Sequence, residues 1–195
     1  MTLIILDRKE KILYADYKST TNNGDGVTHD YCNKIYNLNS GLTFAYAGHV
    51  AALDEFLYYM RDKFLTNVRE FRELIRIFLK THRYPSNYYL SLMGFMGDSS
   101  FSISSPDFAV ISDIPYDEAQ KINRFKAIGS PQTCVSGMLN YLSLNGVEPD
   151  ITSIFDYASK IDSGVSKHYQ TYRRQETDSP PKIKHYNSTE NLAYL

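Results

Sequence analysis

The chain begins Met1-Thr-Leu-Ile-Ile-Leu-Asp-Arg-Lys-Glu-Lys-Ile-Leu-Tyr-Ala-Asp16, and its architecture is most strongly constrained here. Two apolar runs, residues 3–6 and 12–15, flank a charged segment, which predicts a β-hairpin at the start of the chain. Terminal residues of most domains are loosely ordered, whereas these are apolar enough to belong to a core. We therefore expect the rest of the domain to be built around this hairpin.

The position of Thr2 gives it a potential chemical role. Thr is small enough for a preceding Met1 to be trimmed, which would leave a free α-amine on Thr2 beside its own hydroxyl. An α-amine, with a pKa near ~8, can act as the base for that hydroxyl, and this is the arrangement of an N-terminal nucleophile. The alternative is that Thr2 is simply the first residue of a strand, and the hairpin alone favours that alternative.

The bulk composition fits one soluble domain. Of the 195 residues, 43% are hydrophobic and 22% are charged, and the net charge is −1. Because Lys and Arg are spread along the chain, charge makes no case for nucleic acid or an anionic membrane as a partner. No apolar run approaches the ~18 residues of a membrane span, and no signal peptide precedes the hairpin. We therefore expect a cytoplasmic protein.

The cysteine and histidine patterns give no sign of a cofactor. The two cysteines, Cys32 and Cys134, fit a reducing compartment and cannot form a disulfide framework. The five histidines lie far apart, so the spacing of a zinc site does not occur. We expect that no cofactor is required.

The remaining segments predict blocks of strands and blocks of helices. Turn signals dominate residues 17–31, and a polar, mobile tail is expected over 177–195, after a domain of residues 1–176. Strands are predicted over residues 34–38, 42–47, 88–95, 101–104, 108–112 and 124–128, and loosely over 166–175. Helices are predicted over residues 50–64, 68–80, 131–145 and 151–161, with Ser130 and Asp150 as the N-caps of the last two.

This order favours an α+β fold with antiparallel sheets over a parallel, Rossmann-type sheet, because strands and helices do not alternate one by one. The helices come in two pairs that are separated by strands. We therefore expect a layer of helices on each side of two packed sheets.

Four short motifs, in the right order among these elements, resemble those of one family. They are Tyr14-Ala-Asp-Tyr-Lys-Ser-Thr20, similar to A-D-S-R-A-T; Lys34-Ile35 at the start of a strand; Ala45-Tyr-Ala-Gly48 before the first helix; and Ala127-Ile-Gly-Ser130, similar to the G-S-G before the third helix. Over about residues 2–170 the chain resembles the proteasome β-subunit and HslV-type threonine peptidases. The resemblance implies a four-layer αββα sandwich, the fold of N-terminal nucleophile (Ntn) hydrolases.

The resemblance also implies a catalytic set. Thr2 would supply the nucleophile and the amine, and Lys34 would lie beside it as an ammonium that Asp16 holds in place. The backbone N–H of Gly48 would stabilise the oxyanion of the tetrahedral intermediate. Three further residues would support the terminal amine through hydrogen bonds: Ser130, Asp162 and Ser166.

Substrate and ion contacts follow from the same resemblance. Thr20 would offer its backbone to an extended peptide, and Tyr46 and Ala47 would lie at the pocket for the residue before the scissile bond. Because Tyr46 is large, we expect a preference for small residues there. A structural monovalent or divalent cation would be held by the backbone carbonyls of Ser159, Asp162 and Val165.

The sequence departs from the family pattern at several positions. The first hairpin is about two residues shorter, His49 stands where a second glycine is common, and Pro131 replaces the glycine after Ser130. The spacing from Asp162 to Ser166 differs from the family's by one residue. With Thr2 as the nucleophile, the hairpin loses two residues, one from each arm, and every side chain stays on its face of the sheet. The competing alignment puts Met1 at the nucleophile position and needs a one-residue slip, which would reverse every side chain, so we favour Thr2.

Three functions fit these observations. The first is a threonine endopeptidase in a self-compartmentalised homo-oligomeric ring, with a peptide or unfolded protein as substrate and an ATPase unfoldase as partner; it requires removal of Met1. The second is a catalytically silent subunit of the same architecture. The third is an Ntn amidohydrolase that acts on a small amide.

Overall fold

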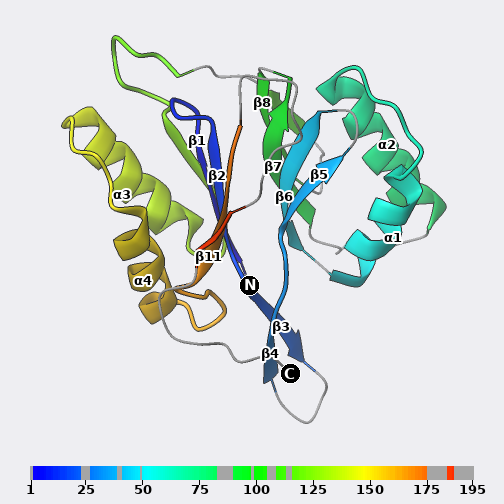
Figure 1. Cartoon of the computed structure of the whole chain (residues 1–195), viewed down its shortest axis with the longest axis horizontal. Coiled ribbons are helices and arrows are strands. Elements are labelled where there is room, and N and C mark those ends of the chain that lie inside the picture. The colour runs from blue at the N-terminus through cyan, green and yellow to red at the C-terminus, as the bar shows by residue number, and fades with distance from the viewer. Residues whose placement is uncertain are drawn as a thin grey trace.

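The computed structural model describes residues 2–22, 27–38, 41–48, 50–82, 90–97, 99–104, 109–112, 116–174 and 184–186. Within these ranges the strands form two five-stranded antiparallel sheets and one separate hairpin. Figure 1 shows the two large sheets packed face to face, with a pair of helices on the outer side of each. The four-layer αββα sandwich that the sequence predicts is thereby confirmed.

The N-terminal hairpin lies in the interior of the first sheet. Its strands β1 (Leu3–Asp7) and β2 (Ile12–Asp16) are neighbours in the order β10-β1-β2-β11-β12. All five side chains of β1 are buried, because sheet neighbours flank it on both edges and packed layers cover both faces. The other strands of this sheet are β10 (Phe125–Gly129), β11 (Tyr169–Arg173) and β12 (Lys184–Tyr186).

The second sheet follows the chain in the order β5-β6-β7-β8-β9, so each strand pairs with the next one in the sequence. The sheets meet across an apolar layer that is rich in small and branched residues, among them Ile4 and Leu6 of β1 and Ala45 and Ala47 of β6. The strand bounds are β5 (Ile35–Leu38), β6 (Leu42–Gly48), β7 (Leu90–Met96), β8 (Ser99–Ser104) and β9 (Ala109–Ser112).

Each helix pair buries an apolar stripe against its own sheet. Phe71, Ile75 and Phe78 are spaced at three to four residues along α2 and are almost fully buried. On the opposite side, Val135 of α3 and Phe155 of α4 pack against the outer face of β1 and β10. The helices are α1 (Val50–Met60), α2 (Val68–Thr81), α3 (Gln132–Leu144) and α4 (Ile151–Ile161).

Two helices begin at side-chain caps. The side chain of Asn67 accepts a hydrogen bond from Glu70 N at 3.0 Å, and Glu70 in turn accepts from Thr66 N, which satisfies backbone donors at the start of α2. Asp150 caps α4 as predicted, since its carboxylate accepts from Thr152 N at 3.0 Å.

Several boundaries and assignments differ from the sequence prediction. Helix α1 ends at Met60 instead of residue 64, and Pro131, not Ser130, occupies the N-cap of α3, where no side-chain cap bond forms. Ser130 is not the cap because its hydroxyl donates to the Asp162 carboxylate instead. Strand β7 begins at residue 90, and residues 88–89 lie outside the described residues.

Residues 17–31 contain more regular structure than their turn signals indicate. Strands β3 (Lys18–Asn22) and β4 (Val27–Tyr31) pair as a separate hairpin that projects from the sandwich (Figure 1). Within the segment predicted as a tail, residues 184–186 form β12 against β11, and the rest of that segment lies outside the described residues.

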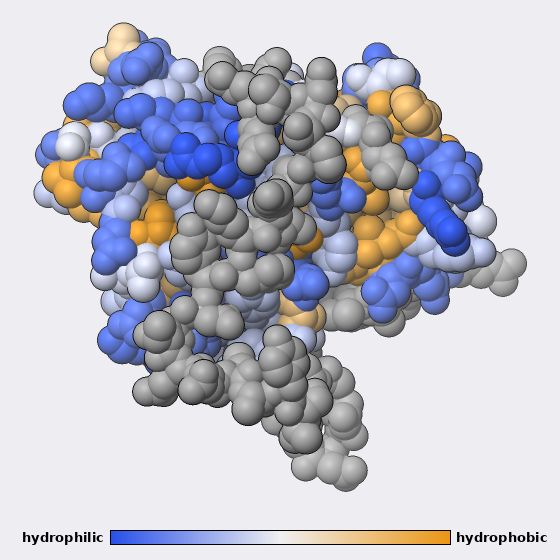
Figure 2. All heavy atoms as spheres, in the orientation of Figure 1, coloured by the Kyte–Doolittle hydropathy of each residue, from blue (hydrophilic) through white to orange (hydrophobic). Residues whose placement is uncertain are grey.

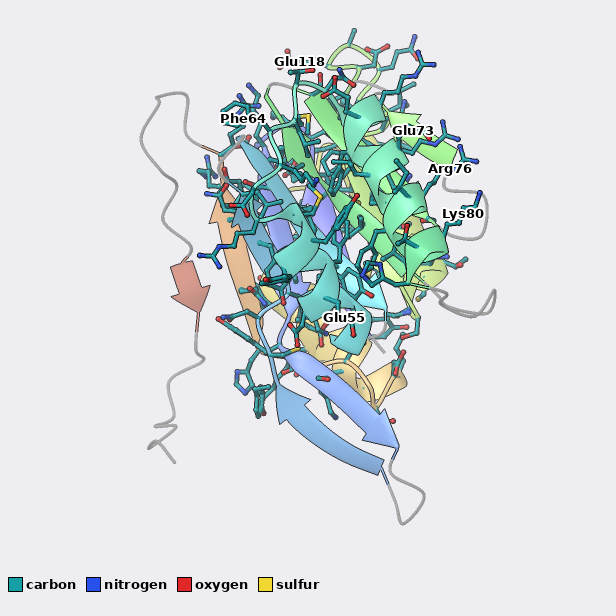
Figure 3. The ribbon with its side chains drawn as sticks, turned by 90° about the vertical axis from the view of Figure 1, so that its right-hand side faces the viewer. Glu55, Phe64, Glu73, Arg76, Lys80 and Glu118 are labelled. Atoms are coloured by element: carbon teal, nitrogen blue, oxygen red, sulfur yellow. The ribbon has the colours of Figure 1, made fainter. Side chains whose placement is uncertain are left out.

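The described surface is largely polar. Figure 2 shows hydrophilic residues over much of the outer sides of both helix layers, and Figure 3 shows Glu55, Glu73, Arg76 and Lys80 on the outer faces of α1 and α2. Phe64, in the connection between these helices, is an exception with 86% of its surface exposed. No helix in the described part of the chain is long and apolar enough to cross a membrane.

A buried ion cluster fixes the end of the first sheet that lies opposite Thr2. The Arg124 guanidinium donates to both oxygens of Asp7, at 2.9 to 3.3 Å, and to the carboxylate of Glu148. Asp7 and Arg124 are 2% and 5% exposed, so removal of Arg124 would leave the Asp7 carboxylate buried without a counter-ion.

We predict that Arg124→Leu lowers the free energy of unfolding by about 3 to 5 kcal/mol, because it leaves the Asp7 carboxylate buried without its counter-ion. Arg173→Leu is the control, since Arg173 forms an exposed pair with Glu10 and its loss should cost less than about 1 kcal/mol. Urea unfolding of both variants measures the difference. Equal, small effects would contradict a structural role for the cluster.

Candidate active site

Thr2 is held at the start of β1 by its backbone. Its carbonyl oxygen accepts a hydrogen bond from Ser130 N at 3.2 Å, and the next residue, Leu3, pairs with Gly129 of β10. Gly129 has φ +112°, and a Cβ on it would lie 1.7 Å from the Thr2 carbonyl oxygen. Only glycine therefore lets β10 approach the Thr2 backbone this closely.

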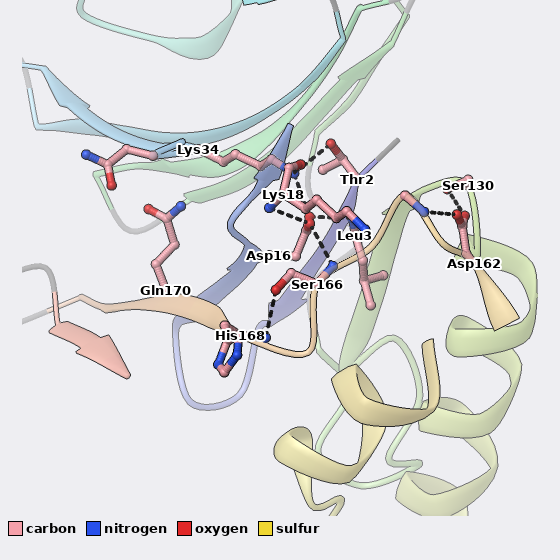
Figure 4. Close-up of polar contacts among 12 residues, drawn as sticks. Thr2, Leu3, Asp16, Lys18, Lys34, Ser130, Asp162, Ser166, His168 and Gln170 are labelled. Carbon is pink, nitrogen blue, oxygen red and sulfur yellow. Dashed lines mark hydrogen bonds and ion pairs between the residues drawn. The ribbon is translucent and has the colours of Figure 1, made fainter. Parts of the chain in front are cut away.

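The ammonium of Lys34 lies beside the Thr2 hydroxyl. Lys34 Nζ is 2.9 Å from Thr2 Oγ1, 2.7 Å from Asp16 Oδ1 and 2.5 Å from the carbonyl oxygen of Lys18 (Figure 4). An ammonium has three N–H donors and no acceptor, so three acceptors match the charged form. In this arrangement Lys34 donates to the hydroxyl, and the base that deprotonates the hydroxyl must be another group.

Asp16 is fully buried and is surrounded by donors. Its Oδ1 accepts from Leu3 N at 2.9 Å as well as from Lys34, and its Oδ2 accepts from Lys18 N at 3.0 Å and from Ser166 N at 3.2 Å. These four donors fill the acceptor positions of a carboxylate and leave no acceptor for an acid proton. The geometry therefore favours the ionised form of Asp16.

Burial and the neighbouring positive charge act in opposite directions on the pKa of Asp16. Burial raises the pKa of Asp16 above its usual range, while the Lys34 ammonium and the N–H groups of Leu3 and Ser166 partly oppose that rise. The ion pair between Asp16 and Lys34 is therefore more sensitive to acid than an exposed pair would be.

A second group of polar residues lies next to this network. The Ser130 hydroxyl donates to Asp162, whose other oxygen accepts from Gly164 N at 2.9 Å. Ser166 contacts Asp16 through its N–H, while its hydroxyl accepts from His168 N at 3.0 Å. Figure 4 shows both groups on the same side of the sandwich as Thr2.

The structure thus links six of the seven predicted catalytic residues. Thr2, Asp16, Lys34 and Ser166 share one chain of contacts, and Ser130 joins it through the Thr2 carbonyl. Asp162 is attached through the Ser130 hydroxyl. Gly48, the seventh, is exposed at the end of β6, where it pairs with Leu90 of β7. Its oxyanion role stays a prediction.

The predicted substrate residues lie on β3 and β6. Thr20 is in β3, opposite residue 29 of β4. Tyr46 and Ala47 are 3% and 2% exposed: the Tyr46 side chain packs in the core beneath α1 and α2, and Ala47 lies between the two sheets. The Tyr46 backbone N–H donates to the Lys34 carbonyl at 3.0 Å. The substrate roles of these residues stay predictions.

Solved structures with the same architecture include the following three. A eukaryotic HslV from Trypanosoma brucei matches with a TM-score of 0.59 and 18% identity, over 87% of this chain and 97% of that one. An Anbu mutant from Hyphomicrobium sp. strain MC1 matches with a TM-score of 0.67 and 13% identity, over 95% and 87%. BPH from Thiobacillus denitrificans, in complex with epoxomicin, matches with a TM-score of 0.64 and 16% identity, over 91% and 100%.

The chain has the HslV fold. No family model and no curated protein matches its sequence, so the likeness rests on structure. The predicted fold and the predicted resemblance to HslV-type and proteasome-like proteins are confirmed at the level of the fold. With identities of 13–18%, the chemistry must be argued from the residues of this chain.

Within the HslV fold, a cation near the end of α4 stays a prediction. The carbonyl oxygen of Asp162 already accepts from Val165 N at 3.0 Å, so one of the three proposed ligands has a hydrogen bond. Among the described residues, no group of three or more His, Cys, Asp or Glu side chains could hold a metal ion.

Two contributors to the site were not anticipated from the sequence. Lys18 acts through its backbone, whose carbonyl accepts from Lys34 and whose N–H donates to Asp16, so its side-chain type gives no signal. Gln170 of β11 is fully buried and accepts from Ile35 N at 3.2 Å, next to Lys34. A buried glutamine in a loosely alternating strand could have been noticed, but its partner lies 135 residues away.

We predict that Gly129→Ala displaces Thr2 and lowers the thermal unfolding midpoint, because the new Cβ would overlap the Thr2 carbonyl. Gly137→Ala is the control: Gly137 lies in α3, its Cβ would meet no atom within 4 Å, and alanine should stabilise the helix by up to about 1 kcal/mol. Thermal melts of both variants measure the effect. A neutral Gly129→Ala would contradict the close approach.

We predict that the carboxyl carbon of Asp16 titrates in an NMR experiment with a pKa above the ordinary value of about 4. Asp150 is the internal control, because its hydrogen bond with Ser153 lowers its pKa. As the pH falls, the folded protein should take up the Asp16 proton before the unfolded chain does. Protonation of Asp16 breaks its ion pair with Lys34. Between the pKa of Asp16 in the folded protein and its lower pKa in the unfolded chain, the folded state is nevertheless favoured as the pH falls, because it binds the proton more tightly. A pKa for Asp16 below that of Asp150 would contradict this.

Proposed function

We propose that the protein is a threonine-type endopeptidase with Thr2 as its nucleophile after Met1 is removed. One observation carries the proposal: Lys34 Nζ is 2.9 Å from Thr2 Oγ1 and is itself held by Asp16 at 2.7 Å, in a buried site. The HslV fold adds support, because the solved structures that share it include an HslV and a protein in complex with epoxomicin.

The α-amine of Thr2 is the proposed general base. Lys34 donates to the hydroxyl and Asp16 accepts four hydrogen bonds, so neither is a good acceptor for the hydroxyl proton. A free α-amine on the same residue can take that proton, and the nearby ammonium favours the neutral form of the amine. The removal of Met1 is therefore a chemical requirement of the mechanism.

The reaction is an acyl transfer in two stages. Thr2 Oγ1 attacks the peptide carbonyl and its proton passes to the amine, while the backbone N–H of Gly48 stabilises the oxyanion. The peptide C–N bond then breaks, the leaving amine takes the proton, and an ester to Thr2 remains. Water, deprotonated by the same amine, hydrolyses the ester and releases the acid.

A homo-oligomeric ring is the proposed assembly, with unfolded protein as the substrate and an ATPase unfoldase as the partner. Large exposed apolar side chains are available on both helix layers, among them Tyr58, which is 78% exposed, and Tyr141, which is 67% exposed. Such residues are compatible with contacts between subunits.

The deciding experiment is intact mass measurement before and after treatment with an α′,β′-epoxyketone peptide. This reagent closes a ring on both an amine and a hydroxyl, so full reaction needs a free, activated Thr2. We predict loss of Met1 and a single adduct. Lys34→Ala should slow adduct formation by about 100-fold or more, because the hydroxyl loses its neighbouring positive charge.

Lys80→Ala is the matched control, since Lys80 is exposed in the last turn of α2, on the outer face of the opposite helix layer (Figure 3), and its loss should leave the rate unchanged. Retention of Met1 with no adduct would end the peptidase proposal and favour the silent subunit. Hydrolysis of a small acyl amide without cleavage of peptides would favour the amidohydrolase.

A further inference from the structure

Gln170 is the one buried side chain of β11 whose polar group contacts the opposite sheet in the described structure. It pairs with Ala15 of β2 and lies two residues before Tyr172, and both of these belong to the apolar layer between the sheets. Residues opposite each other, and residues two apart, share a face of a sheet. The amide of Gln170 therefore projects into the layer between the two sheets.

The partner of Gln170 is a backbone group at a sheet edge. Strand β5 is the outermost strand of its sheet, and Ile35 lies opposite Ala45. Because Tyr46 N donates to the carbonyl of Lys34, the N–H of the following residue, Ile35, points away from β6. Gln170 Oε1 accepts from this N–H at 3.2 Å, which gives a buried edge donor its acceptor.

The nitrogen of the same amide makes no comparable hydrogen bond. Gln170 Nε2 is buried and has no hydrogen-bond partner among the described residues. Burial of an unpaired amide donor is costly, and an apolar side chain of the same length would avoid that cost. The bond from Ile35 N is the one hydrogen bond of this amide among the described residues, and it offsets part of that cost.

We propose that Gln170 is a positioning residue for Lys34, an inference that rests on the proposed function. The main chain at Lys34 is fixed on one side by Tyr46 N and on the other by the Gln170 amide at Ile35. These two hydrogen bonds fix the backbone position from which the Lys34 side chain extends. Its ammonium then meets Thr2 and Asp16 in the arrangement that activates the hydroxyl (Figure 4).

The test compares three variants with the wild type. Gln170→Met keeps the length of the side chain and removes the acceptor. Gln170→Glu keeps an acceptor oxygen in either protonation state. Thr171→Val is the matched control, since Thr171 is the next residue of β11 and its buried hydroxyl also has no partner among the described residues. The readouts are the rate of epoxyketone adduct formation, kcat and KM for a peptide, and the thermal midpoint.

We expect Gln170→Met to lower the adduct rate and kcat by about 10- to 100-fold with little change in KM, as a small displacement of a catalytic group does. Gln170→Glu should restore most of the rate, and Thr171→Val should match the wild type. A reactive wild type with an equally reactive Gln170→Met would overturn the positioning role alone. The positioning role would also be overturned if Gln170→Met lowered the rate only as far as it lowered the thermal midpoint and Gln170→Glu did not restore the rate. An inert wild type would instead overturn the proposed function, and this inference with it.

Discussion

The buried contact between Lys34 and Asp16 is the interaction on which the site depends. A pair of charges removed from water is stable only when the remaining hydrogen-bonding capacity is satisfied. Here every N–H of the ammonium has an acceptor and all four positions of the carboxylate have donors. The Thr2 hydroxyl is one of those acceptors, so the nucleophile candidate is part of the network that makes burial of the charges tolerable.

The backbone supplies most of this network. Leu3, Lys18 and Ser166 contribute N–H groups to Asp16, and Lys18 also contributes a carbonyl to Lys34. These segments lie on β1, on β3 and just before β11, so the site exists only where the strands are in register. Rigid, preorganised donors of this kind cost no reorganisation when charge develops in a reaction.

The sandwich brings the two sheets close enough for such contacts. Lys34 lies directly before β5 of one sheet, while Thr2 and Asp16 belong to the other, and the apolar layer between the sheets excludes water from their meeting point. Low exposure strengthens the attraction between the charges, and it also raises the pKa of Asp16. The same packing therefore makes the pair strong and sensitive to acid.

The sequence by itself determined the elements and the short motifs. The continuous apolar runs of the first hairpin, the helical spacing in α2 and the cap at Asp150 are local patterns that predicted the elements. The short motifs that resemble those of HslV-type and proteasome-like proteins predicted the four-layer fold and the set of Thr2, Asp16 and Lys34. Boundaries at Met60 and the strands β3 and β4 were missed, because packing and pairing outweigh turn signals there. Only the tertiary structure decided the backbone role of Lys18 and the contact of Gln170 with Ile35. Those contacts join residues whose proximity depends on register and on sheet packing, which no local pattern encodes.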